Sequence, residues 1–141
     1  MDLKEYYKML YKKNHKEVYD YLMDNILEIK VHSYRDHSEV KNTISNSNVT
    51  LNIKECYNNS ALISLGHDFN YELGTLLDII PMDHAWNSFE DFHFDLTAEI
   101  VLDKVFNNYY SIKSFNIDDL NHYLTNIKNI PPMIYDIFPK K

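Results

Sequence analysis

Residues 52–97 read NIKECYNNSALISLGHDFNYELGTLLDIIPMDHAWNSFEDFHFDLT, and this stretch decides the fold. The apolar residues between Cys56 and Leu65 recur at helical spacing, which predicts a helix. Gly66 follows the last of them, at the position where a C-terminal cap glycine is typical. Dense or alternating apolar patterns then predict three strands, in residues 73–80, 82–89 and 92–97.

The segment before this stretch is predicted to be mainly helical. Apolar residues recur at helical spacing through residues 2–30, and Asn14 marks a break or cap between two short helices. Residues 28–34 alternate as a strand does, although they also fit the end of the helix. Residues 35–47 are polar and without periodicity, so we expect a loop there, followed by an extended segment over residues 49–53.

The segment after this stretch begins with residues 100–106, which fit a short helix or an irregular connection. Residues 109–115 alternate and predict a strand. A helix is expected from Asn116, a favourable capping residue, to about Lys128. The apolar residues 133–138 are expected to pack back on the core.

These elements predict an α+β fold in a single domain, residues 1–141. Its length of 141 residues is typical of one domain, and a hydrophobic fraction of 45% indicates a folded chain. We expect N-terminal helices, and a central helix over residues 56–65 that packs on a small antiparallel sheet.

The composition also excludes several classes of partner. A net charge of −7 argues against a nucleic-acid binder and against attraction to anionic membranes. The single cysteine rules out an internal disulfide bond. No signal peptide and no apolar run of about 20 residues is apparent, so we expect a cytoplasmic protein that does not cross a membrane.

Cys56 is the first candidate for chemistry because it lies where its helix is predicted to begin. A thiol becomes a good nucleophile as a thiolate, which a helix N-terminus and a neighbouring imidazolium both favour. The backbone N–H groups at such a terminus can also stabilise an oxyanion. Cys56 is therefore the candidate nucleophile, with its own N–H as one oxyanion donor.

His84 and Asp95 are the candidates for base and orienting carboxylate. If residues 82–89 and 92–97 form a hairpin centred near Glu90, His84 lies opposite residue 95 or 96, on the same sheet face as Asp95. The Glu90-Asp91 turn lacks the glycine of a favoured two-residue turn, so the register stays open. His93 is expected to face the opposite side of the sheet.

The same residues carry a resemblance to a known family. Cys56-Tyr57-Asn58-Asn59-Ser60-Ala61, then His84-Ala85-Trp86-Asn87, then Phe94-Asp95-Leu96-Thr97 resemble the core of the transglutaminase-like branch of the papain-like cysteine superfamily. That resemblance covers roughly residues 50–115. It implies a helix-borne nucleophile, a strand-borne base and an aspartate on the next strand, which would be Cys56, His84 and Asp95.

The chain departs from that family in two places. Glu55 directly precedes the cysteine, where an acid opposes thiolate formation, and no upstream glutamine is placed as an oxyanion donor. Asn52 or Asn59 is a substitute candidate for that donor, and Trp86 is a candidate for contact with substrate.

Two functions follow from this pattern. The first is a small cysteine-dependent hydrolase or acyl transferase that acts on an amide, isopeptide, ester or thioester bond of a protein or peptide. The alternative is a non-catalytic binding or inhibitor protein on the same fold, encoded by a virus or mobile element, that engages a partner protein. No close-spaced set of ligands supports a zinc site at Cys56 and His84, so we expect no metal and no cofactor.

Overall fold

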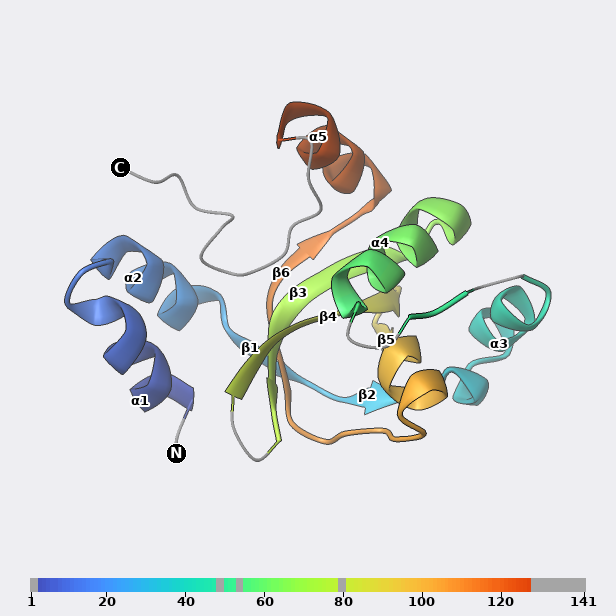
Figure 1. Cartoon of the computed structure of the whole chain (residues 1–141), viewed down its shortest axis with the longest axis horizontal. Coiled ribbons are helices and arrows are strands. Elements are labelled where there is room, and N and C mark those ends of the chain that lie inside the picture. Colours follow the sequence, from blue (N-terminus) through green and yellow to red (C-terminus); the bar gives the residue numbers. More distant parts are fainter. Residues whose placement is uncertain (1–2, 48–49, 53–54, 79–80, 128–141) are drawn as a thin grey trace.

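The computed structural model describes residues 3–47, 50–52, 55–78 and 81–127. In this part the chain has a mixed α+β structure, with helices arranged around one six-stranded sheet (Figure 1). The strands are β1 (Leu27–Ile29), β2 (Val31–His32), β3 (Asn70–Leu77), β4 (Pro81–Phe89), β5 (Phe92–Phe94) and β6 (Tyr109–Phe115). The helices are α1 (Leu3–Tyr7), α2 (Lys16–Asn25), α3 (Ser38–Ser45), α4 (Cys56–His67) and α5 (Ile117–Ile127), with the short helical segments η1 (Lys8–Lys12), η2 (Tyr34–Asp36) and η3 (Thr97–Val101).

The sheet is curled so that its two edges approach each other. The strand order is β1-β6-β3-β4-β5-β2, so β1 and β2 form opposite edges although only Lys30 separates them in the chain. Because consecutive Cα atoms are about 3.8 Å apart, the two edges lie within about 8 Å of each other at this point. The strand pairs are antiparallel, as expected, except that β2 runs parallel to β5.

The buried apolar side chains of the described residues form three clusters: one inside the curl of the sheet, one outside it, and a third that joins α3 to α4 and β5. The inner cluster contains Val31, Leu76, Trp86 and Tyr109, all buried. The outer cluster joins the sheet to α1, α2, α4 and α5; its buried members are Leu3, Tyr7, Val18, Leu22, Ala61, Tyr71, Leu73, Ala85, Ile112, Phe115 and Leu120. The helix that begins at Cys56 therefore packs on the sheet, as the sequence predicted.

Several predicted elements lie where the sequence indicated. β6 spans the predicted residues 109–115, and the chain leaves helical structure around Asn14. α5 begins after Asn116, whose Oδ1 accepts a hydrogen bond from Asp119 N at 2.8 Å while Asp119 Oδ2 accepts one from Asn116 N at 3.4 Å. Residues 133–138, 49 and 53 lie outside the described part.

The prediction of a loop over residues 35–47 is wrong, because this segment contains η2 and the two-turn helix α3. Val40 and Ile44, four residues apart, bury one face of α3 against Ile63 and Phe94. His37 caps the helix, since its Nδ1 accepts a hydrogen bond from Val40 N at 3.3 Å. A single buried pair and an unusual cap were enough to form the helix.

The predicted cap at Gly66 is also wrong. α4 continues to His67, and Asp68 takes the left-handed conformation that ends it, with φ of 56°. Gly66 thus lies inside the last turn of the helix, and an aspartate fills the place for which glycine was expected.

A buried carboxylate lies on β3 without a cationic partner among the described residues. Glu72 is 3% exposed, and its carboxylate accepts hydrogen bonds from the hydroxyls of Ser88 (2.9 Å), Ser111 (3.1 Å) and Ser114 (2.8 Å). Burial raises the pKa of Glu72 above its ordinary value, and the three hydroxyls oppose that rise. Glu72 therefore binds its proton more tightly in the folded chain than in the unfolded chain.

We expect the stability of Glu72→Gln, measured relative to that of the parent, to increase as the pH rises from acidic to neutral. A raised carboxyl pKa gives stability that is greatest below the unfolded pKa of about 4.3 and is lost as the pH rises through the folded value. The amide lacks this loss, so the free energy of unfolding of the variant should gain on the parent as pH rises. Urea unfolding over a pH series measures this, with the exposed Glu28→Gln as control; parallel curves for Glu72→Gln and the parent would contradict it.

Candidate active site

Cys56 opens α4 and is partly exposed. The residue before it, Glu55, is the N-cap, and its side chain makes no capping hydrogen bond. Its carbonyl oxygen accepts the first intrahelical hydrogen bond, from Asn59 N at 2.8 Å. The N–H groups of the first turn have no acceptor within a helix, so they point out of the helix end beside the thiol.

Asn59 fixes the approach of the chain to Cys56. Its side chain is 1% exposed and bonds the backbone of Asn52 in both directions, accepting from Asn52 N at 3.1 Å and donating to Asn52 O at 2.9 Å. It also donates to Thr97 Oγ1 at 3.1 Å. Both hydrogens of the Asn59 side-chain amide are therefore bonded within the protein. Asn59 thus holds the chain at Asn52 and Thr97 and does not offer an N–H to a substrate oxyanion. The Asn52 side chain is exposed.

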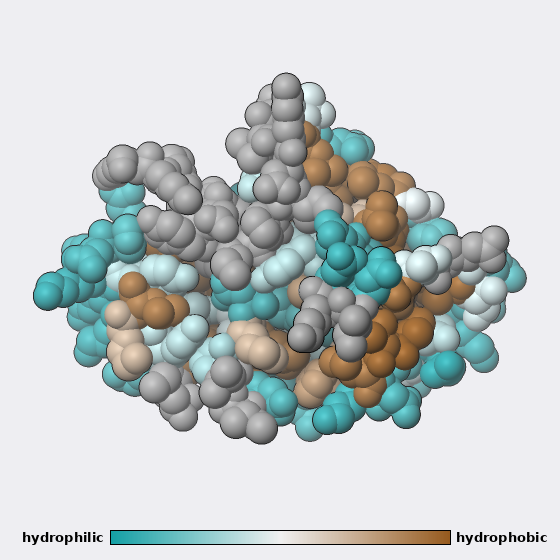
Figure 2. Space-filling view, in the orientation of Figure 1, coloured by the Kyte–Doolittle hydropathy of each residue, from teal (hydrophilic) through white to brown (hydrophobic). Residues whose placement is uncertain are grey.

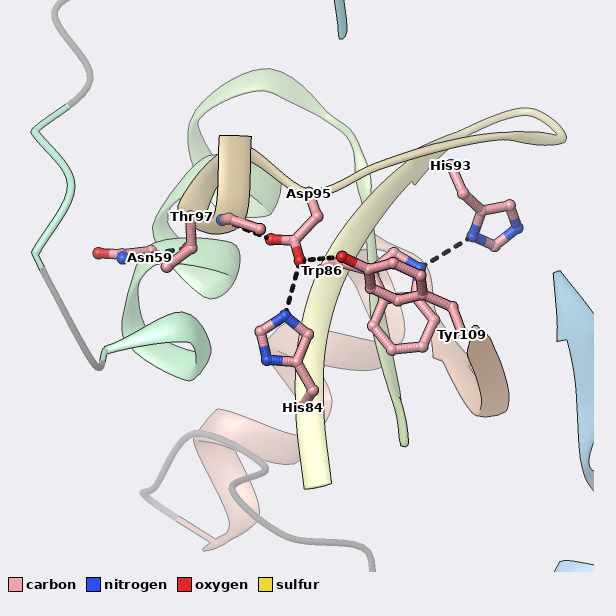
Figure 3. A network of polar contacts seen from close by, with 8 residues as sticks. Asn59, His84, Trp86, His93, Asp95, Thr97 and Tyr109 are labelled. Atoms are coloured by element: carbon pink, nitrogen blue, oxygen red, sulfur yellow. Dashed lines mark hydrogen bonds and ion pairs between the residues drawn. The ribbon is translucent and has the colours of Figure 1, made fainter. Parts of the chain in front are cut away.

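His84 and Asp95 form an ion pair beside the start of α4. The distance from His84 Nε2 to Asp95 Oδ2 is 2.7 Å, and their side chains are 14% and 2% exposed (Figure 3). Burial disfavours the imidazolium, but the Asp95 carboxylate and a side-chain hydrogen bond with Cys56 outweigh it and raise the pKa of His84 to about 10. His84 is thus paired with Asp95 and lies near enough to Cys56 to interact with it electrostatically.

Asp95 reaches His84 by a different route from the predicted one. β5 ends at Phe94, which pairs with Asn87, so His84 has no direct partner on β5. Asp95 instead leaves the strand and begins the turn into η3, where its Oδ1 accepts a hydrogen bond from Ala98 N at 3.2 Å. The contact is present, but direct placement across the two strands is wrong.

Tyr109 is a fourth residue of this network, and sequence reasoning missed it. Its hydroxyl donates to Asp95 Oδ2 at 2.6 Å, the same oxygen that binds His84 (Figure 3). Burial and the adjacent Asp95 carboxylate raise the pKa of Tyr109 well above its usual range, so the hydroxyl stays protonated. The only sequence signal was its place at the start of a predicted strand.

Trp86 supports the network from inside the curled sheet. It is fully buried, its ring stacks on His84 with centroids 6.2 Å apart, and it meets Tyr109 edge-on at 5.1 Å. Its Nε1 donates to His93 Nδ1 at 3.0 Å, and burial lowers the pKa of His93. A buried Trp86 packs the site and does not present a surface to substrate, contrary to expectation.

His93 lies on the same face of the sheet as Trp86, so its expected placement on the opposite side is wrong. His93 and Asp95 are two residues apart, and side chains two apart along a strand share a face.

An apolar surface flanks the site where α4 contacts η3. Figure 2 shows hydrophobic side chains gathered over α4 and over η3 on this face of the molecule. Leu62 on α4 is 64% exposed, and Ile100 and Leu102 at the end of η3 are each 49% exposed. The surface therefore lies on the helix that begins at Cys56 and on the segment that follows Asp95.

The described residues contain no group of three or more histidine, cysteine or acidic side chains able to hold a metal ion. Among them there is also no helix with the length and apolar character needed to cross a bilayer. In comparisons with known proteins, no family model, no curated protein and no solved structure matches this chain.

Proposed function

We propose that this chain is a cysteine-dependent acyl-transfer enzyme that acts on an amide, isopeptide, ester or thioester bond. The observation that carries the proposal is the grouping of three side chains: His84 pairs with Asp95 at 2.7 Å, and Cys56 lies close enough to His84 to help raise its pKa. A partly exposed thiol at a helix start, a half-buried histidine that interacts with it and a carboxylate paired with that histidine are the parts of such a site.

In the proposed resting state His84 is an imidazolium beside the Cys56 thiolate, because its pKa of about 10 keeps it protonated at neutral pH and the thiol proton has left to solvent. Because Nε2 is bonded to Asp95, the proton that His84 later gives to the substrate is the one on Nδ1. The Cys56 thiolate attacks the substrate carbonyl carbon, and N–H groups of the first turn of α4 stabilise the resulting oxyanion. His84 then protonates the leaving amine, alcohol or thiol as its bond to carbon breaks, which leaves a thioester on Cys56.

The second half returns the enzyme to its starting state. Water or an amine attacks the thioester carbonyl, His84 accepts the proton of the attacking group, and the Cys56 sulfur departs. The orienting role of Asp95 is to hold the His84 ring in place and to stabilise the imidazolium.

The order of the parts also supports a transglutaminase-like fold within the papain-like superfamily. A helix-borne cysteine comes first, then a histidine on β4, then an aspartate directly after β5. The apolar surface over α4 and η3 is compatible with a peptide or protein substrate. The net charge of −7 disfavours nucleic acid as substrate.

The experiment that tests this function is a panel of model thioesters, esters and glutamine or lysine amide peptides, assayed with the parent and with Cys56→Ala. We expect turnover of at least one class by the parent, and a covalent acyl adduct on Cys56 detected by mass spectrometry of the intact protein. Absence of any adduct, with equal background rates for parent and variant, would contradict the proposal.

A further inference from the structure

The carboxylate of Asp95 is held by more groups than orienting His84 alone requires. Its Oδ1 accepts from Ala98 N at 3.2 Å, and its Oδ2 accepts from both His84 Nε2 at 2.7 Å and the Tyr109 hydroxyl at 2.6 Å. Two donors on one oxygen fix both its position and the plane of the carboxylate. Tyr109 and His84 therefore share a single acceptor atom.

Tyr109 itself is rigidly placed. It is the first residue of β6 and pairs with Ile29 of β1 on one side and with Leu76 of β3 on the other. Its ring is fully buried and packs edge-on against Trp86. Because β6 pairs with a strand on each side and the ring is buried, the Tyr109 hydroxyl has a fixed position. It therefore restrains the Asp95 carboxylate against rotation.

We propose that Tyr109 is a positioning residue of the site, whose hydroxyl holds Asp95 Oδ2 at the place where His84 binds it. This inference rests on the proposed function, because it assigns Tyr109 a task in the work of His84 and Cys56. The Tyr109 hydroxyl bonds the Asp95 carboxylate, and it acts on His84 and Cys56 through that carboxylate. Without its hydroxyl the carboxylate keeps only the bonds from Ala98 N and His84, so water can bind Oδ2 and His84 is held less firmly toward Cys56.

Tyr109→Phe separates this role from packing, because the variant keeps the ring and removes only the hydroxyl. We expect Cys56 alkylation by iodoacetamide at pH 7 to slow by about tenfold, the effect of losing one hydrogen bond to a charged group. We also expect the His84 Nε2 proton, followed by NMR, to exchange with water about tenfold faster. The matched control is Tyr34→Phe, in the cluster of α3, which should leave both measurements unchanged.

A second replacement keeps the test decisive if Tyr109→Phe folds poorly. Site-specific 3-fluorotyrosine at position 109 retains a hydroxyl donor and should leave the alkylation rate and the proton exchange within about twofold of the parent. Alkylation and exchange unchanged in Tyr109→Phe would overturn the inference, as would tenfold effects in the fluorotyrosine protein.

The two proposals fail in different ways. If alkylation of the parent does not depend on His84, the proposed function fails, and the exchange of the His84 Nε2 proton still reports whether Tyr109 holds Asp95. If alkylation depends on His84 but neither measurement responds to Tyr109→Phe, the inference about Tyr109 fails alone.

Discussion

Replacing Asp95 with asparagine is expected to lower the pKa of His84 from about 10 to below its ordinary value of 6.5. Burial by itself disfavours the charged imidazolium, and the Asp95 carboxylate is the main group that overcomes it. The variant retains the burial and loses the negative charge. Titration of the His84 ring by NMR measures this, and a value near 10 in Asp95→Asn would contradict the electrostatic argument.

Asp95→Asn should also lower the reactivity of the Cys56 thiol and the stability of the folded protein. At pH 7 His84 would be neutral, so it could no longer accompany a thiolate, and Cys56 alkylation should slow by about tenfold or more. A histidine pKa raised by folding gives stability that is complete below the unfolded value of 6.5 and is lost as pH rises through about 10. The loss of stability in Asp95→Asn should therefore be greatest at acidic and neutral pH.

Asp91→Asn is the matched control for these effects. The Asp91 carboxylate acts on His93, whose pKa it raises against the effect of burial. This variant should lower the pKa of His93 and leave that of His84 near its parent value.

Gly74→Ala is expected to lower the free energy of unfolding by about 3 kcal/mol or more, the upper range for overpacking a core. A Cβ at position 74 would overlap the carbonyl oxygen of Tyr110 and lie 2.7 Å from Cη2 of Trp86. The Tyr110 carbonyl belongs to the backbone of β6, so it cannot rotate away as a side chain can. The pairing of β3 with β6 is irregular at this point, since its register shifts between Leu73 and Gly74 of β3. Gly74 pairs with His84, so strain here also reaches the site.

The other glycine provides the opposite result. Gly66 lies in α4, and an added Cβ would have no heavy atom of the described residues within 4 Å beyond its own stretch of helix. Gly66→Ala should therefore raise the free energy of unfolding by about 0.5–1 kcal/mol. Urea unfolding of the two variants and the parent gives both values. A stability for Gly74→Ala equal to that of the parent would show that β3 and β6 are not as close as described.

Periodicity located the elements whose pattern is long and regular. β4, β6 and α5 lie close to their predicted residues because their apolar side chains follow the pattern of the element. α4 also lies where it was predicted, although Leu62 and Leu65 are exposed and its buried side chains include Asn59, Ser60 and Ser64. The contact between His84 and Asp95 was also predicted, since the two sequence segments that contain them flank a short turn. Local pattern is enough where neighbours in the chain are neighbours in space.

Features that depend on distant or unusual partners were missed. α3 was predicted as a loop because only Val40 and Ile44 are buried on it, and histidine is not among the residues that usually cap a helix. Tyr109 lies 14 residues after Asp95, and only the pairing of β6 with β1 and β3 brings its hydroxyl there. No spacing of residues in the sequence indicates that the Tyr109 hydroxyl lies next to Asp95.

The end of β5 could not be predicted for a related reason. The two-residue turn uses Glu90 with φ of 54°, a conformation for which glycine or asparagine is the usual signal. The resulting register stops the strand at Phe94 and leaves Asp95 to the following turn, whose bond from Ala98 N is not visible in an alternating pattern.

The rate of Cys56 alkylation by iodoacetamide across a pH series, in the parent and in His84→Ala, is the most direct test that Cys56 and His84 act together. We expect the parent to react at least about tenfold faster at pH 7 than His84→Ala, because the imidazolium favours the thiolate beside it. His67→Ala, at the far end of α4, should match the parent. Equal rates for parent and His84→Ala would contradict the catalytic proposal and leave a binding protein on this fold as the alternative.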